Sequence, residues 1–167
     1  MQLGTTQEKL KALGVETMAV VNTPQARARL YFKYRPSRVL LAADPEAATH
    51  RLFGVPQAVV VEDESATSWP YTATMGQLLA VKMNPTGELA TATHPFAAME
   101  IINKKDGFEP NETDQQIAHA HGTQLAGHFL IDREGIIRWG HIEAGERMED
   151  LSKFPSDDEI LAAARSL

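Results

Sequence analysis

Residues 127–142 read Gly-His-Phe-Leu-Ile-Asp-Arg-Glu-Gly-Ile-Ile-Arg-Trp-Gly-His-Ile, and this stretch decides the fold. Two apolar runs, 129–131 and 136–139, flank the polar segment 132–135. The glycine at the end of that segment suits a turn that needs a positive φ, and apolar runs on both sides of such a turn are typical of a β-hairpin. We therefore predict two antiparallel strands here.

Helices are expected on both sides of this hairpin. Ser156-x-x-Glu159 forms a capping box, and the apolar residues that follow recur on one side of a helix. Asn111 is placed as the N-cap of a short helix over 112–120.

Two successive units of strand, cap, proline and helix occupy the first third of the chain. Apolar runs at 15–21 and 38–43 predict buried strands, and the residues after each run predict helices over 24–35 and 47–53. Parallel strands joined by helical crossovers have this order, so the sequence predicts an α/β fold.

The starts of the first two helices are predicted from capping residues. Thr5-x-x-Glu8 is a capping box for the first helix, which Gly14 ends. Thr23 is the expected N-cap of the second helix, and Pro24 its first residue.

The middle of the chain follows a less regular pattern. We predict a strand at 55–61 and a helix over 71–83, whereas the prolines and glycines within 84–110 predict irregular structure. The interpretation is a single domain covering 1–167, with an insertion at about 62–111.

Composition limits the classes of function. A chain of 167 residues with 43% apolar content can form one domain with a sizeable core. It contains no cysteine, which excludes disulfides, thiolate metal sites and thiol catalysis by its own residues. No signal-like start and no long apolar run is visible, so we expect a cytoplasmic protein without membrane association.

The charge pattern argues against nucleic acid as a partner. The net charge is −6, whereas a phosphate-tracking surface is usually supported by net positive charge. We interpret the densest group of basic residues as the solvated face of one helix. Its members are Arg27, Arg29, Lys33, Arg35 and Arg38.

Four segments, in this order along the chain, carry a family resemblance. They are Leu13-Gly14-Val15-Glu16 leading into Ala19-Val20-Val21, Leu40-Leu41-Ala42-Ala43-Asp44-Pro45, Leu52-Phe53-Gly54-Val55, and Gly127-x-Phe129-Leu130-Ile131-Asp132-Arg133-x-Gly135-x-Ile137-Arg138-Trp139. Together they resemble the alkyl hydroperoxide reductase and thiol-specific antioxidant family, the peroxiredoxin-like redoxins. The resemblance implies a thioredoxin-like three-layer α/β/α fold with a mixed sheet, and thiol-dependent oxidoreductase or antioxidant activity for the family.

The chain departs from this family at its reactive site. The family's helix before Val15 normally begins with the reactive cysteine, often as Cys-x-x-Cys closely followed by Gln-Leu, and Gln2-Leu3 stands at that place here. Ala126 stands where the family has an arginine or, in many thioredoxin-like proteins, a nearby cis-proline. The resemblance therefore implies no catalytic residue, metal or cofactor in this chain.

The family's cleft would persist without its chemistry. By the resemblance, we expect Gln2, Gln124, Ala126 and Gly127 to line a vestigial cleft.

The strand that precedes the cysteine motif in the family is also missing, so the expected fold is N-terminally incomplete. In thioredoxin-like sheets this strand runs centrally, between the strands predicted at 15–21 and 129–131. Its loss would leave unpaired backbone groups at two facing edges. We therefore hypothesise a homodimer in which a strand or helix of each copy completes the other.

Side chains outside the motifs offer weaker alternatives. Six histidines suggest a metal site, but His119 and His121 are two residues apart and face different sides of a helix. A hairpin can make His128 and His141 cross-strand neighbours, yet no spaced metal motif exists, so surface or hydrogen-bonded histidines are favoured. Four carboxylates after the hairpin are interpreted as solvated loop charge: Glu143, Glu146, Glu149 and Asp150. Three further residues are interpreted as cover for the core: Trp69, Tyr71 and Met75.

Three functional hypotheses follow. The first is a redoxin-type thiol oxidoreductase or peroxidase whose nucleophile lies in a segment upstream of Met1. The second is a cysteine-free redoxin-like module that binds a partner or small ligand without turnover. The third, a histidine metal enzyme, is the least favoured. The first hypothesis is favoured for the family, and the second for this polypeptide, which we predict to be catalytically inactive.

Overall fold

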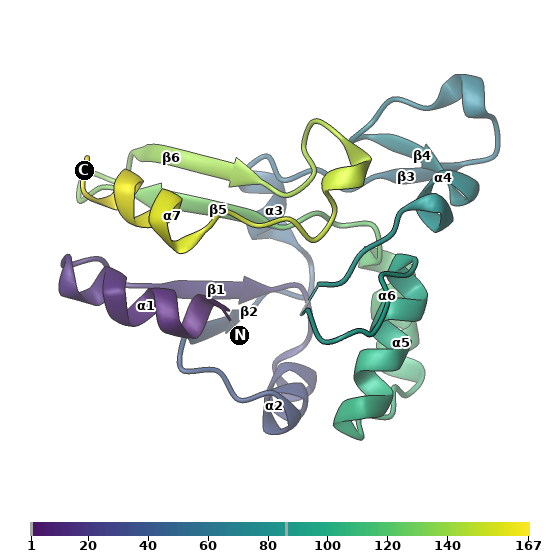
Figure 1. The fold of residues 1–167 in the computed structure, drawn as a ribbon, viewed down its shortest axis with the longest axis horizontal. Helices are drawn as coiled ribbons and strands as arrows, with labels where there is room; N and C mark the ends of the chain where they lie inside the picture. Colours follow the sequence, from purple (N-terminus) through teal and green to yellow (C-terminus); the bar gives the residue numbers. More distant parts are fainter. Residues whose placement is uncertain (1, 86) are drawn as a thin grey trace. The chain divides into compact units, whose positions relative to one another are not determined.

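The computed structural model describes residues 2–85 and 87–167, with the side chains of all of these except Gln2 and Leu3. The chain divides into two compact units, and Figure 1 labels the helices and strands that they contain. The first comprises the residues up to Thr49, Gly127–Ile142 and Phe154–Leu167, and the second comprises His50–Ala126 and Glu143–Lys153. The elements are α1 (Gln2–Ala12), β1 (Met18–Val21), α2 (Gln25–Tyr34), β2 (Leu40–Ala43), α3 (Ala48–Leu52), β3 (Val59–Val61), the 3-10 turn η1 (Glu64–Ala66), β4 (Thr72–Thr74), α4 (Met75–Ala80), α5 (Pro95–Asp106), α6 (Glu112–His121), β5 (Gly127–Ile131), β6 (Ile137–Ile142), the 3-10 turn η2 (Met148–Asp150) and α7 (Asp157–Ala164).

The strands pair in twos. In the first unit β1 lies parallel to β2, with Met18 opposite Leu40, and β5 lies antiparallel to β6. In the second unit β3 lies parallel to β4, with Val59 opposite Thr72. The predicted α/β class is confirmed, and the first parallel pair forms from the two runs that predicted it. The prediction that these two strands are buried was wrong, because their residues are half-buried or exposed.

The hairpin is confirmed, and its turn explains why it forms. The Asp132 carboxylate accepts the backbone N–H groups of Glu134 and Ile136, each at 2.9 Å, while Gly135 takes a φ of 83°. Arg138 Nε donates to the same carboxylate at 2.6 Å. The Ile136 N–H, above all, holds the pKa of Asp132 below its ordinary value, because these hydrogen bonds favour the ionised form.

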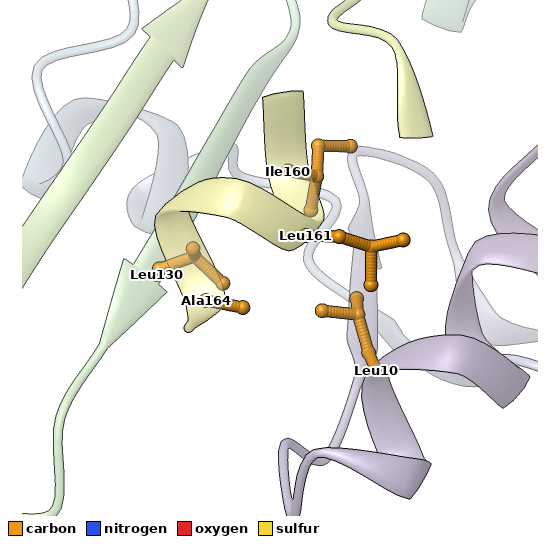
Figure 2. Close-up of a cluster of buried hydrophobic side chains, with 5 residues drawn as sticks. All are labelled: Leu10, Leu130, Ile160, Leu161 and Ala164. Carbon is orange, nitrogen blue, oxygen red and sulfur yellow. The ribbon is translucent and has the colours of Figure 1, made fainter. Parts of the chain in front are cut away.

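The core of the first unit is formed where α1, β5 and α7 meet. Figure 2 shows Leu10 of α1 directed towards α7, with Leu130 of β5 beside Ala164. Leu10 is 4% exposed, and Ile160 and Leu161 of α7 are 7% exposed each. The capping box predicted at Ser156 and Glu159 is present and begins α7.

A polar contact fixes the same two helices beside their apolar contact. Lys9 Nζ lies 2.6 Å from an Asp157 oxygen, and the Thr6 hydroxyl donates to the other oxygen of that carboxylate. Lys9 and then Thr6 hold the pKa of Asp157 below its ordinary value. These contacts join α1 to the first residue of α7.

The predicted starts of the first two helices were wrong. Helix α1 already includes Gln2, so Thr5 lies inside the helix and cannot be its N-cap. Pro24 occupies the N-cap position of α2, and no side chain caps that end. Thr23 therefore lies one residue before the N-cap. The prediction placed Pro24 at the first helical position, whereas this proline lies just outside the helix.

The segment 84–110 is not irregular throughout, because it contains α5. The backbone N–H of Ala97 donates to His94 Nδ1 at 3.2 Å at the start of this helix, and Gly107 ends it with a φ of 69°. Ala98 and Ile102 are buried at helical spacing. The prediction of irregular structure was therefore wrong for these residues, because Pro95 and Gly107 mark the two ends of a helix.

The helix predicted over 71–83 was too long at both ends. Its first residues form β4, and Thr74 and Gln77 then form a capping box that begins α4. The β-branched residues Thr72 and Thr74 pair with β3, so strand pairing replaces the first helical turn.

Leu10→Ala should lower the free energy of unfolding by about 2–4 kcal/mol, because it opens a cavity between α1 and α7. Leu13 lies just after the same helix and is 42% exposed, so Leu13→Ala is the matched control and should cost less than about 1 kcal/mol. Urea denaturation of both variants measures this. Equal losses for the two variants would show that the α1–α7 contact does not hold the unit together.

Candidate binding pocket

The second unit contains a small, mostly apolar pocket. Its volume is about 190 Å³. The polar residues at its wall are Thr123, Gln124 and Glu143. The apolar lining residues are Ala58, Trp69, Leu78, Met83, Pro95, Phe96, Met99, Leu125 and Leu151. A cavity of this size suits a molecule about as large as a single ring.

Trp69 joins the pocket wall to the segment after β6. Its indole Nε1 donates to the Ala144 carbonyl oxygen. Ala144 is 4% exposed and has a φ of 50°, a conformation that costs free energy for a residue with a Cβ. The surrounding contacts therefore hold this segment in a strained conformation against the pocket.

Glu143 lies buried at the pocket, with 8% of its surface exposed. Its carboxylate accepts the backbone N–H of Ser152 through one oxygen and that of Ala126, at 3.4 Å, through the other. The prediction that Glu143 carries solvated loop charge was therefore wrong. Backbone donors on both sides replace the water that a carboxylate needs, and local sequence does not show them.

Thr123 and Gln124 use their side-chain donors on the neighbouring backbone. Thr123 Oγ1 donates to the Ala58 carbonyl oxygen, and Gln124 Nε2 donates to the Pro56 carbonyl oxygen at 2.8 Å. A carboxylate can accept more than two hydrogen bonds. The pocket therefore suits an apolar molecule that carries a hydroxyl or amine donor for Glu143.

The four residues expected to line a cleft have different positions. Gln124 lines the pocket, and the Ala126 N–H supports Glu143 at its wall. Gly127 is the first residue of β5 and pairs with Ile142. Gln2 belongs to α1, and its side chain lies outside the described part of the structure.

Trp69, Tyr71 and Met75, which lie before α4 or at its first residue, do not share one role. Trp69 lines the pocket, whereas Tyr71 is 65% exposed and Met75 is 43% exposed. The prediction that all three cover the core was wrong. Phe96 and Met99 also line the pocket but were not predicted as site residues, because they lie on α5, in a stretch that was predicted to be irregular.

His128 and His141 face each other across the hairpin of the first unit. They are directly paired residues of β5 and β6, with ring centroids 6.3 Å apart. The Phe154 ring packs edge-on against the His128 ring, with the two ring centroids 5.6 Å apart. Nδ1 of His128 and Nε2 of His141 are buried and have no hydrogen-bond partner among the described residues. Burial, followed by the neighbouring His141, holds the pKa of His128 below its ordinary value.

No set of three or more histidine, aspartate or glutamate residues within 2–85 and 87–167 is grouped so that it could hold a metal ion. In the same residues no helix has both the length and the apolar character needed to cross a bilayer. None of the protein-family models, curated proteins or solved structures compared with this chain gives a significant match.

We expect the protein to lose stability as pH falls below about 6.5, the ordinary histidine pKa. The folded chain holds the pKa of His128 below that value, so the unfolded chain binds the proton more tightly and acid favours unfolding. The contribution of His128 is fully present above about pH 6.5 and is lost as the pH falls towards the folded pKa.

Urea denaturation between pH 5 and pH 8 measures this effect. His128→Gln should flatten the pH dependence, with His119→Gln, a change at an exposed histidine of α6, as the control. An unchanged slope in His128→Gln would contradict the assignment.

Proposed function

We propose that this protein is a peroxiredoxin-like redoxin scaffold of the thioredoxin-like three-layer type, and that this chain is not itself a catalyst. One observation carries the proposal. In the first unit the β1–β2 pair and the β5–β6 pair are separate two-stranded sheets, and no strand ladder joins them in the described residues. A thioredoxin-like sheet that lacks its central strand would leave these two pairs separate.

The apolar residues of these strands support the same proposal. Met18 of β1 is 60% exposed and Leu40 of β2 is 67% exposed, although both belong to the runs that predicted buried strands. Strand residues of this kind are usually covered on both faces in a parallel sheet. A further strand and its flanking structure would supply part of that cover.

The chemistry of the family requires sulfur from outside this chain. A peroxidatic thiolate attacks one peroxide oxygen and the O–O bond breaks, so that the cysteine becomes a sulfenic acid and the other oxygen leaves as an alkoxide, which takes a proton to become the alcohol. A second thiol then condenses with the sulfenic acid to form a disulfide and release water. No side chain here can take the part of that thiolate, since the chain has no cysteine. A segment that pairs between β1 and β5 would bring the thiol to the start of α1.

A second copy of the chain is the alternative source of the missing pairing. Two copies that exchange a strand or a helix would cover the same open edges and form a homodimer. The two sources differ in mass, so one experiment distinguishes them.

The chain alone should show no hydroperoxide turnover with a dithiol reductant. An N-terminal extension of about six alternating Val and Thr residues, ending in Cys-x-x-Cys directly before α1, should protect β1 and β5 amides from hydrogen exchange. It should also confer measurable turnover. The matched control carries two prolines in the added strand, which prevent pairing.

Light scattering of the unextended chain tests the dimer. A monomer together with protection by the extension supports the missing strand, and a dimer whose β1 and β5 amides are already protected supports exchange between copies. If the unextended chain is a monomer and the extension leaves the hydrogen exchange of the β1 and β5 amides unchanged, both the missing strand and the exchanged dimer are contradicted.

A second candidate function is binding of a small ligand without turnover, and the pocket of the second unit favours it. The apolar wall, the buried Glu143 carboxylate and the anchored Trp69 indole form one site within a single unit. The ligand class is a small apolar molecule with one hydrogen-bond donor.

Benzyl alcohol, a ring with one hydroxyl donor, should bind saturably and shift the Trp69 indole N–H resonance in an NMR titration. Met99→Trp should weaken binding by roughly tenfold or more, since the larger side chain occupies the pocket. Ile101→Trp is the control, because Ile101 is 50% exposed on the same helix and does not line the pocket. Absence of saturation, or equal weakening by both variants, would contradict a ligand site.

A further inference from the structure

A second concave site lies in the first unit, between α2 and β2, and it differs in chemistry from the apolar pocket. Its volume is about 660 Å³, within the usual range for small-molecule sites. The lining residues that matter here are Ala28, Arg29, Phe32, Lys33, Leu41 and Ala42. We call it the cationic groove.

The floor of the cationic groove is apolar. Ala28 is 7% exposed, and Phe32, Leu41 and Ala42 are half-buried. The Tyr31 ring lies edge-on to the Phe32 ring, with the two ring centroids 5.7 Å apart. This floor can cover an alkyl chain or a ring.

Two cations lie on the rim of the cationic groove. Arg29 and Lys33 are both exposed and are four residues apart on α2, so their side chains project from the same face. Among the ion pairs of the described residues, neither has a carboxylate partner. By contrast, Arg38 of the same basic group pairs with Glu8 at 2.7 Å.

This arrangement changes the interpretation of the basic group. Solvated helix charges usually face water on the side away from the fold, whereas Arg29 and Lys33 border a concave apolar floor. The chain as a whole has a net charge of −6, so two uncompensated cations at one concave site are a local exception. They give the cationic groove complementarity to an anion attached to an apolar body.

We propose that the cationic groove binds a small amphiphilic anion, a single carboxylate or phosphate head on an alkyl or aromatic body. The head lies between the Arg29 guanidinium, which can bind it through two parallel N–H groups, and the Lys33 ammonium. The body covers Phe32, Leu41 and Ala42. This site is independent of the redoxin proposal, because it uses neither a thiol nor the open strand edges.

Titration with octanoate and with octyl phosphate, followed by NMR of the α2 and β2 amides, tests the proposal and compares the two head groups. We expect saturable binding of octanoate or octyl phosphate. Acetate and 1-octanol should each bind more weakly by roughly tenfold or more, because the charged head and the apolar body both contribute to the affinity. Binding should weaken with added salt.

The charge-removing variant is Arg29→Gln with Lys33→Gln, and it should weaken binding of the better probe by roughly tenfold or more. The matched control is Lys11→Gln with Arg133→Gln, which changes net charge equally at exposed positions outside the groove. Equal binding by the two double variants overturns the proposal. The proposal is also overturned if acetate or 1-octanol binds with the same affinity as octanoate and octyl phosphate.

An acidic extended peptide is the remaining occupant to test, because β2 pairs only with β1 among the described strands. Protection of β2 amides by such a peptide, in the absence of octanoate or octyl phosphate binding, would also overturn the small-molecule assignment. Failure of these titrations leaves the redoxin proposal unaffected, since that proposal depends on β1 and β5.

Discussion

The contact between α1 and α7 is the interaction on which the first unit depends. Leu10 joins a helix at one end of the chain to Leu161 at the other end, and Leu130 adds the hairpin to the same cluster. The Lys9–Asp157 ion pair lies beside this apolar contact, where partial exposure limits its contribution. Without the cluster, the β5–β6 hairpin would have little to hold it, since a strand pair alone is marginal in water.

The second unit combines an apolar core with buried and half-buried polar groups. Its central polar contacts link residues far apart in sequence: Trp69 to Ala144, Gln124 to Pro56, and Glu143 to both Ala126 and Ser152. Each contact satisfies a group that would be costly to bury alone. These contacts also fix the wall of the pocket, so the stability of this unit and the shape of its candidate site have the same origin.

The proposed functions use different parts of the chain. The redoxin proposal depends on strand edges that the described residues leave unjoined, and it requires a thiol that this chain lacks. The pocket and the cationic groove depend on side chains present in the chain, one site offering a buried carboxylate and the other two exposed cations. They therefore select ligands of opposite character, a neutral or cationic donor and an amphiphilic anion.

Local sequence determined the elements whose cause is local. Asp132 and Gly135 carry the turn chemistry of the hairpin. The capping box at Ser156 begins α7 and the N-cap Asn111 begins α6, both as predicted, because those contacts span only a few residues. Only the tertiary structure decided which polar side chains are buried: Glu143 depends on backbone donors, one of them at Ala126, that meet it only in the folded chain. The two candidate sites could not be predicted from the sequence for the same reason. Each combines residues from several elements, and spacing along the chain does not show which of them lie close together in space.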